Sequence, residues 1–265
     1  MKEMKIWIIT DLEGVAGVFS FEECSSGKRY EIAKSLLTQE VNAAIEGALE
    51  MGAKEILVVD SHGPGGIRIE ELHPEAKLLG GRPIPLPWGL EEGFDAAFII
   101  GQHAMAGIEK AHLSHTMSHV NVQNIWLNGA RIGEIGIIAA IAGYFDVPVV
   151  LVTGDEAACA EARNLIPNIK TVAVKKGITH GSAISVTPVK ARKMIKEGAK
   201  EALKMIDKIE PYKVKAPIEL IIEYSESGKR LAEILSQRPG LERVDGRTVR
   251  IRGEDLLEVL KKWRA

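Results

Sequence analysis

The sequence has few cysteines, few aromatic residues and no long hydrophobic run. Its two cysteines, Cys24 and Cys159, form neither a disulfide framework nor a Cys-x-x-Cys metal motif, which favours a reducing compartment. The longest apolar run, residues 135–145, is about half of the roughly 20 residues that a membrane span requires. The apolar stretch 6–9 is too short for a secretory signal. We therefore expect a cytoplasmic protein with no membrane partner.

An excess of charge of one sign is also lacking. The 34 basic and 36 acidic residues give a net charge of -2, so no basic footprint for nucleic acid is present. The segment Gly63-Pro64-Gly65-Gly66 does not follow the order G-x-G-x-x-G, and the sequence contains no Walker A pattern. Nucleic acid is therefore excluded as a partner, and nucleotide binding is disfavoured.

What is present is an alternation of strand and helix signals. Apolar runs of strand length occupy residues 5–10, 56–60 and 96–101, and helical spacing of apolar residues covers 29–51. Near-continuous apolar strands separated by helices predict a parallel sheet that is covered on both faces. The alternation of strand and helix continues later, with a strand predicted over 147–153 and a helix over 155–165.

The remaining segments have a different character. Asn128-Gly129 predicts a tight hairpin within 124–133, and a helix begins at Thr187, its N-cap, and runs to about residue 209. Beyond it, residues 218–224 alternate between apolar and charged. We predict an α/β fold: a three-layer α/β/α core with a mostly parallel sheet over 1–186, and a smaller C-terminal α+β lobe over 187–265. The segment 110–132, which includes part of the hairpin, is a candidate to pack with that lobe.

Chemically active side chains follow each predicted strand. Ligands of open α/β sheets bind where the carboxyl ends of the strands meet, so these side chains are expected to converge. Two imidazoles and three carboxylates suit zinc, with manganese or cobalt as substitutes, and they can hold two ions if one carboxylate bridges them. The candidate ligands are Asp11, Glu13, His62, His103 and Glu134.

Each of these motifs also has an ordinary structural interpretation. An Asp-x-Glu after a strand is common in turns, and a single histidine after an apolar strand is usually a hydrogen-bonded structural residue. Their coincidence at every predicted strand end favours a metal site, because burying so many charges without a counter-ion would be costly.

A histidine-rich segment, 111–119, carries three of the seven histidines. One interpretation is a polar loop with incidental metal affinity. The other is that one histidine lines the site and moves protons, since imidazole titrates near neutral pH. The spacing alone does not choose among His112, His115 and His119.

Five short motifs occur together along the first half of the chain. They are Thr10-Asp11-Leu12-Glu13-Gly14, Asp60-Ser61-His62, Gly101-Gln102-His103, Ser114-His115 and Gly133-Glu134-Ile135-Gly136. In order and approximate spacing they resemble the zinc-dependent D-aminopeptidase family. The similarity covers most of the first 210 residues and fades toward the C-terminus.

This resemblance implies a peptidase with two zinc ions per chain, acting on short peptides with N-terminal D-residues. It implies that Asp11 bridges the ions and that His115 is the catalytic histidine, while Glu13 with His62 and His103 with Glu134 complete the two sites. The family also forms homo-oligomers, decamers of two stacked pentameric rings. Where the family pattern is expected to have an asparagine, this chain has Ile138, which puts the stereospecificity in doubt.

Other functions remain open at this point. The same two-metal cage serves hydrolases of other amides and of phosphate esters. A non-enzymatic metal-binding or peptide-binding protein would retain the ligands but would not need His115.

Overall fold

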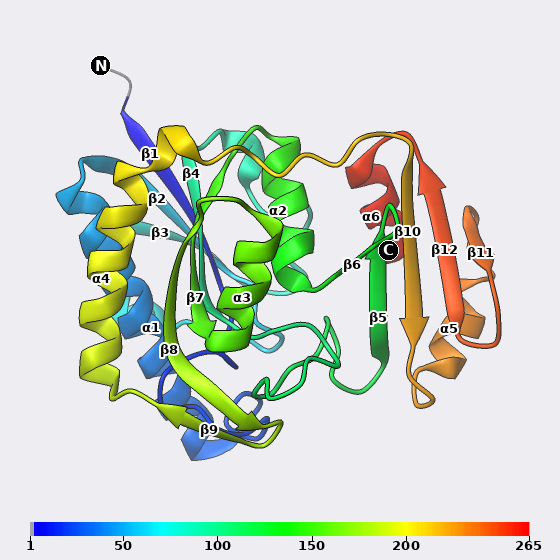
Figure 1. Cartoon of the computed structure of the whole chain (residues 1–265), viewed down its shortest axis with the longest axis horizontal. Coiled ribbons are helices and arrows are strands. Elements are labelled where there is room, and N and C mark those ends of the chain that lie inside the picture. The colour runs from blue at the N-terminus through cyan, green and yellow to red at the C-terminus, as the bar shows by residue number, and fades with distance from the viewer. Residues whose placement is uncertain (1–2, 265) are drawn as a thin grey trace.

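The computed structural model describes residues 3–264. Two sheets lie side by side in it (Figure 1). The first has seven strands in the order β3-β2-β1-β4-β7-β8-β9, and the second has five in the order β11-β12-β10-β5-β6. No helix in this part of the chain is long and apolar enough to cross a membrane.

The first sheet is parallel except for its last strand, which runs antiparallel to its neighbour. Its central strands are almost completely buried, as their continuous apolar sequences predict. The strands are β1 (Met4–Thr10), β2 (Ala53–Asp60), β3 (Ala76–Leu79), β4 (Ala96–Gln102), β7 (Val149–Asp155), β8 (Lys170–Thr179) and β9 (Ser182–Ser185).

Helices cover both faces of this sheet, which confirms the three-layer α/β/α core. On one face α1 (Gly27–Glu50) packs against α4 (Pro188–Lys204), and on the other lie α2 (Glu134–Tyr144) and α3 (Glu156–Leu165) (Figure 1). Short 3-10 turns complete the lobe at Ile69–Glu71, Leu90–Glu92 and Ile206–Lys208.

The helix that begins after Thr187 packs in the first lobe, whereas the sequence analysis placed it in the second. The Thr187 hydroxyl accepts a hydrogen bond from the backbone of Lys190, and Pro188 opens the first turn, as predicted. Its buried face consists largely of alanine and glycine, which allows close contact with α1, β7 and β8. The C-terminal chain therefore enters the second sheet only after this helix.

The second sheet combines the predicted hairpin with the C-terminal strands. The strands β5 (Val122–Leu127) and β6 (Ala130–Ile132) turn at Asn128-Gly129, where both residues have positive φ, and β5 pairs with β10. The sheet is completed by β10 (Ile218–Tyr224), β11 (Leu241–Arg243) and β12 (Thr248–Gly253), with helices α5 (Lys229–Leu235) and α6 (Leu256–Arg264).

Candidate metal centre

The strand register brings the predicted ligands to one edge of the first sheet. Thr10, the last residue of β1, is aligned with Asp60 at the end of β2 and with Ile100 near the end of β4. The residues that follow these positions therefore emerge at the same level, and they include Asp11, His62 and His103.

Glycines allow the backbones at this edge to approach each other. A Cβ at Gly14 would overlap the carbonyl oxygen of Gln102, and one at Gly101, which has a φ of 80°, would overlap the carbonyl of Asp11. The backbone amides of Asp11 and Gly14 donate hydrogen bonds to Ile100 and Gly101. The loop after β1 is thus held directly on the end of β4 because these positions lack side chains.

The first group of candidate ligands consists of Asp11, Glu13 and His62, all buried. The Nδ1 atom of His62 lies 2.9 Å from Oδ1 of Asp11 and 3.4 Å from Oε2 of Glu13. Its other ring nitrogen, Nε2, lies 2.7 Å from the carbonyl oxygen of Cys24, to which it donates. A ligating histidine usually donates its second N–H in this way, which leaves Nδ1 free to face an ion.

The second group is built in the same way around His103. Its Nε2 atom lies 3.2 Å from Oδ2 of Asp11 and 3.3 Å from Oε1 of Glu134, the first residue of α2. Its Nδ1 atom donates to the carbonyl of Ala104 at 2.9 Å. Asp11 therefore presents one carboxylate oxygen to each of the two histidines and lies between the two groups.

The buried charges strongly perturb one another. Burial raises the pKa of the Asp11 carboxyl, but pairing with His103 and His62 outweighs it and holds that pKa well below its ordinary value. The charge of His103 likewise outweighs burial at Glu134 and lowers its pKa to about 2. Burial opposes protonation of His62, but Glu13 and Asp11 raise its pKa to about 11. The carboxylates thus hold their negative charge and attract a cation.

Two buried atoms at the centre of the cluster have no hydrogen-bond partner within residues 3–264: Oε2 of Glu13 and Nε2 of His103. Both are good metal ligands, and unsatisfied buried polar atoms are costly. The candidate ligand atoms are carboxylate oxygens and imidazole nitrogens, and a backbone carbonyl fixes the ring of each histidine. This set of ligands fits zinc.

His115 is the histidine of the 111–119 segment that reaches this cluster. Its ring stacks on that of His103 with centroids 3.8 Å apart, and its Nε2 lies 3.7 Å from Oε1 of Glu134. The Nδ1 atom donates to the carbonyl of Leu113 at 2.9 Å, so Nε2 is the nitrogen that faces the site. Burial, together with the charge of His103, lowers the pKa of His115. Its position suits either a third ligand beside His103 and Glu134 or an acid–base group.

The other two histidines of this segment have different surroundings. His112 is buried, and its Nε2 donates to the carbonyl of Phe19. His119 is exposed and stacks on Phe21 at 4.3 Å. Of these three histidines, only His115 therefore lies within a group of candidate ligands, although His119 also lines the cavity beside it.

Two ionisable residues that sequence reasoning missed, the buried Lys175 and the half-buried Glu161, hold the ligand loops from behind. Lys175 on β8 donates to the carbonyls of Glu13 and Val18 at 2.5 and 2.8 Å, and burial lowers its pKa to about 8. Glu161 on α3 accepts from the backbone amide of Met105 at 2.8 Å, and burial raises its pKa to about 7. No local pattern marks either residue, because their partners lie far away in the sequence.

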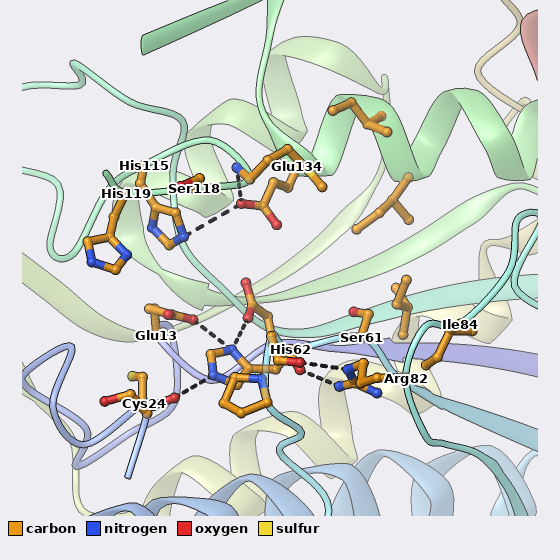
Figure 2. Close-up of a pocket in the computed structure, with 18 of the residues that line it drawn as sticks. Glu13, Cys24, Ser61, His62, Arg82, Ile84, His115, Ser118, His119 and Glu134 are labelled. Atoms are coloured by element: carbon orange, nitrogen blue, oxygen red, sulfur yellow. Dashed lines mark hydrogen bonds and ion pairs between the residues drawn. The ribbon is translucent and has the colours of Figure 1, made fainter. Parts of the chain in front are cut away.

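A cavity of about 750 Å³ opens beside the cluster (Figure 2). His115 and Glu134 are on one side of it, and His62 and Glu13 lie opposite them across the space. Apolar side chains that line it include Ile84, Trp88, Ile137 and Ile138. Two cationic side chains, Arg82 and Arg264, also line it. Sequence analysis had identified neither arginine.

Buried carboxylates and imidazoles at the carboxyl edge of a parallel sheet, opening onto a cavity of this size, define the class of α/β metallohydrolases. A family model described as D-aminopeptidase, Peptidase_M55, matches residues 4–265, and the chain belongs to this family. It is therefore a hydrolase of the aminopeptidase type.

Two comparisons extend this result. The chain is 37% identical over 260 residues to a D-aminopeptidase of Bacillus subtilis (strain 168), covering 96% of this chain and 93% of that protein. It is also similar to a solved structure, the Zn-dependent D-aminopeptidase DppA from Bacillus subtilis, a self-compartmentalizing protease. That match has a TM-score of 0.93 and 35% identity, and it covers 98% of this chain and 96% of the other.

Proposed function

We propose that this protein is a zinc-dependent aminopeptidase that binds two zinc ions per chain and removes N-terminal D-residues from short peptides. The observation that carries the proposal is the position of Asp11. Each of its carboxylate oxygens faces a different histidine, at 2.9 and 3.2 Å, as expected of a bridging ligand. The similarity to D-aminopeptidases along almost the whole chain supports the substrate class.

In this proposal Asp11 is shared, Glu13 and His62 hold one ion, and His103 and Glu134 hold the other. Zinc bound there would supply a Lewis acid that polarises the peptide carbonyl and would lower the pKa of water, so that hydroxide is available near neutral pH. The protein holds these ligands in place through the carbonyls of Cys24 and Ala104, which orient the two rings.

His115 moves the proton. Its Nδ1 is committed to the carbonyl of Leu113, so the neutral ring presents the lone pair of Nε2 to the cavity. Burial lowers the pKa of His115 and so favours the neutral ring, which can accept a proton from the attacking water. Nε2 then donates that proton to the leaving amine as the peptide C–N bond breaks.

The closing experiment measures metal content and turnover in the same sample. After purification without nickel, elemental analysis is expected to find about two zinc ions per chain, and D-alanine anilide to be hydrolysed faster than L-alanine anilide. His115→Ala should keep both ions and lose turnover, whereas His73→Ala, a turn residue away from the cavity, should change neither.

Three results would contradict parts of the proposal. Loss of one zinc ion in His115→Ala would make His115 a ligand rather than the proton carrier. Preference for the L-anilide would remove the stereospecificity. Turnover of p-nitrophenyl phosphate in place of the anilides would indicate a phosphatase built on the same cage.

We further propose that the chain assembles into a decamer of two stacked pentameric rings. The support is the solved relative, which is a self-compartmentalizing protease that matches 98% of this chain. Sedimentation equilibrium is expected to give about ten times the 28.9 kDa chain mass. A monomeric mass at micromolar concentration would contradict this assembly.

A further inference from the structure

Arg264, the last residue of α6, adds a positive charge to a cavity that is also lined by negatively charged carboxylates. The guanidinium carbon lies 5.4 Å from the ring centroid of Trp88, and both side chains line the cavity. The helix α6 belongs to the second lobe and contacts α2, which carries Glu134 and Ile138. The second lobe thus contributes a cation to a site whose candidate metal ligands all come from the first sheet and α2.

The two arginines of the cavity differ in how their donors are used. Arg82 donates to the carbonyls of His62, Gly63 and Gly81, and its guanidinium lies 3.6 Å from Asp60. These contacts commit Arg82 to holding the loop that carries His62. Arg264 is exposed and makes no hydrogen bond or ion pair within residues 3–264, and its guanidinium contacts only the face of the Trp88 ring. Its donors are therefore available to a ligand.

Arg264 and four of the candidate ligands line the same cavity, so one bound molecule can contact both. The four ligands are Asp11, Glu13, His62 and Glu134. Trp88 is fixed to the first sheet, because the indole Nε1 of Trp7 on β1 donates to the Trp88 carbonyl at 3.0 Å. An extended peptide advances about 3.3 to 3.6 Å per residue, so a di- or tripeptide of about 7 to 11 Å suits a cavity of about 750 Å³.

We infer that Arg264 binds the C-terminal carboxylate of a short peptide whose amino end lies at the metal centre. A short peptide carries a positive group at one end and a negative group at the other, which matches the carboxylate-rich cluster and the guanidinium of this cavity. A guanidinium can hold a carboxylate through two parallel hydrogen bonds. The substrates would then be free di- and tripeptides rather than long chains or C-terminal amides.

This inference depends on the proposed aminopeptidase function, and its test separates the two. The probes are the tripeptide D-Ala-Ala-Ala and its C-terminal amide, assayed with the zinc-loaded protein. For the wild type, kcat/KM for the free acid is expected to exceed that for the amide by about 10- to 100-fold, the range for one charge-assisted contact. Arg264→Gln should abolish this preference mainly through KM, because the contact is remote from the reacting bond.

Two further variants make the comparison specific. Arg264→Lys keeps the positive charge but lacks the planar guanidinium that can donate two parallel hydrogen bonds, so it should retain part of the preference for the free acid. Lys261→Gln removes an exposed charge from the same helix and should retain all of it. A wild type that does not distinguish acid from amide, or an Arg264→Gln variant that keeps the full preference, would overturn the inference and leave the aminopeptidase intact. Failure of the wild type to cleave either probe would overturn both.

Discussion

Asp11 differs from the other candidate ligands because it belongs to both groups. Its Oδ1 also accepts from the backbone amide of Leu12 at 2.9 Å, and its Oδ2 accepts from the side-chain amide of Gln102 at 2.9 Å. These bonds fix the plane of the carboxylate between His62 and His103. In the proposed arrangement, a substitution of Asp11 therefore affects both ion sites, whereas a substitution of Glu13 affects one.

We expect Asp11→Asn to lose more zinc than Glu13→Gln. An amide has only one oxygen ligand and no charge, so the variant weakens both sites at once, while Glu13→Gln leaves the site at His103 and Glu134 intact. Zinc per chain, measured after dialysis against a weak chelator, should fall toward zero in the first variant and toward one in the second. Equal retention in both would contradict the bridging assignment.

His112 is a buried residue whose protonation opposes folding. Burial lowers its pKa to about 4, and the charges that face it are Lys175 and His180, which lower it further, and Glu23, which raises it. Because the unfolded chain protonates this imidazole near pH 6.5 and the folded chain only near pH 4, the unfolded state binds more protons between these values. Stability should therefore fall as the pH decreases from 6.5 to 4.

This pH effect can be measured by urea unfolding of zinc-free protein at pH 7 and pH 5. We expect the wild type to lose about 1–2 kcal/mol more than His112→Gln over this interval, since the variant has no imidazole to titrate. His73→Gln, which alters a histidine outside the core, should behave like the wild type. An identical loss in wild type and His112→Gln would show that the buried imidazole does not contribute.

At the level of elements, the site depends on how closely the ends of β1 and β4 approach. Gly14 lies against the carbonyl of Gln102 with no room for a Cβ, whereas Gly63, in the loop after β2, has nothing within 4 Å of such an atom. Gly14→Ala must therefore move the loop that carries Asp11 and Glu13.

We predict that Gly14→Ala destabilises the fold by about 1–3 kcal/mol, as overpacking against rigid backbone does, and also weakens zinc binding. Gly63→Ala is the matched control and should change stability by less than about 0.5 kcal/mol. Denaturant midpoints and zinc content of both variants provide the measurement. A Gly14→Ala protein with wild-type stability would show that the loop and β4 can separate freely.

The same elements show what sequence patterns can predict. Long periodic segments were located to within about two residues: the helix expected over 29–51 is Gly27–Glu50, and the strand expected over 147–153 is Val149–Asp155. The strand β8, Lys170–Thr179, was not predicted, because its lysines and exposed positions interrupt the apolar pattern. One of those lysines, Lys175, is buried only because β8 passes behind the loop after β1.

The candidate site was predictable to a similar extent. A sheet brings the ends of its parallel strands together by rule, so the convergence of Asp11, Glu13, His62 and His103 could be predicted from the sequence. Glu134 instead follows β6 of the antiparallel second sheet, and the packing of α2 brings it to His103. Glu161 and Arg264 reach the site from α3 and α6, whose positions depend on tertiary packing. No periodicity or spacing contains that information.

At the scale of the whole molecule, the two lobes meet at the metal centre. The hairpin β5–β6 leaves the first lobe to pair with β10 and returns through Gly133 directly to Glu134. The cavity is likewise lined by β1, by α2 and by the end of α6. A metal ion bound by Glu134 therefore connects the second sheet to the edge of the first.

Zinc should consequently stabilise the molecule as a whole. Three carboxylates share this cluster, and a cation bound only by the folded chain adds about 2.7 kcal/mol when its concentration is 100 times its Kd. For a chain of this size each kcal/mol raises Tm by about 2–4 °C. We expect removal of zinc with EDTA to lower Tm by about 5–10 °C for each ion lost, measured by circular dichroism, and added zinc to restore it. Asp11→Asn should show little response to EDTA because it has little zinc to lose. If the wild type and this variant responded equally, the stabilising ion would be bound outside the cluster, and Glu134 would join the two lobes without the help of a metal.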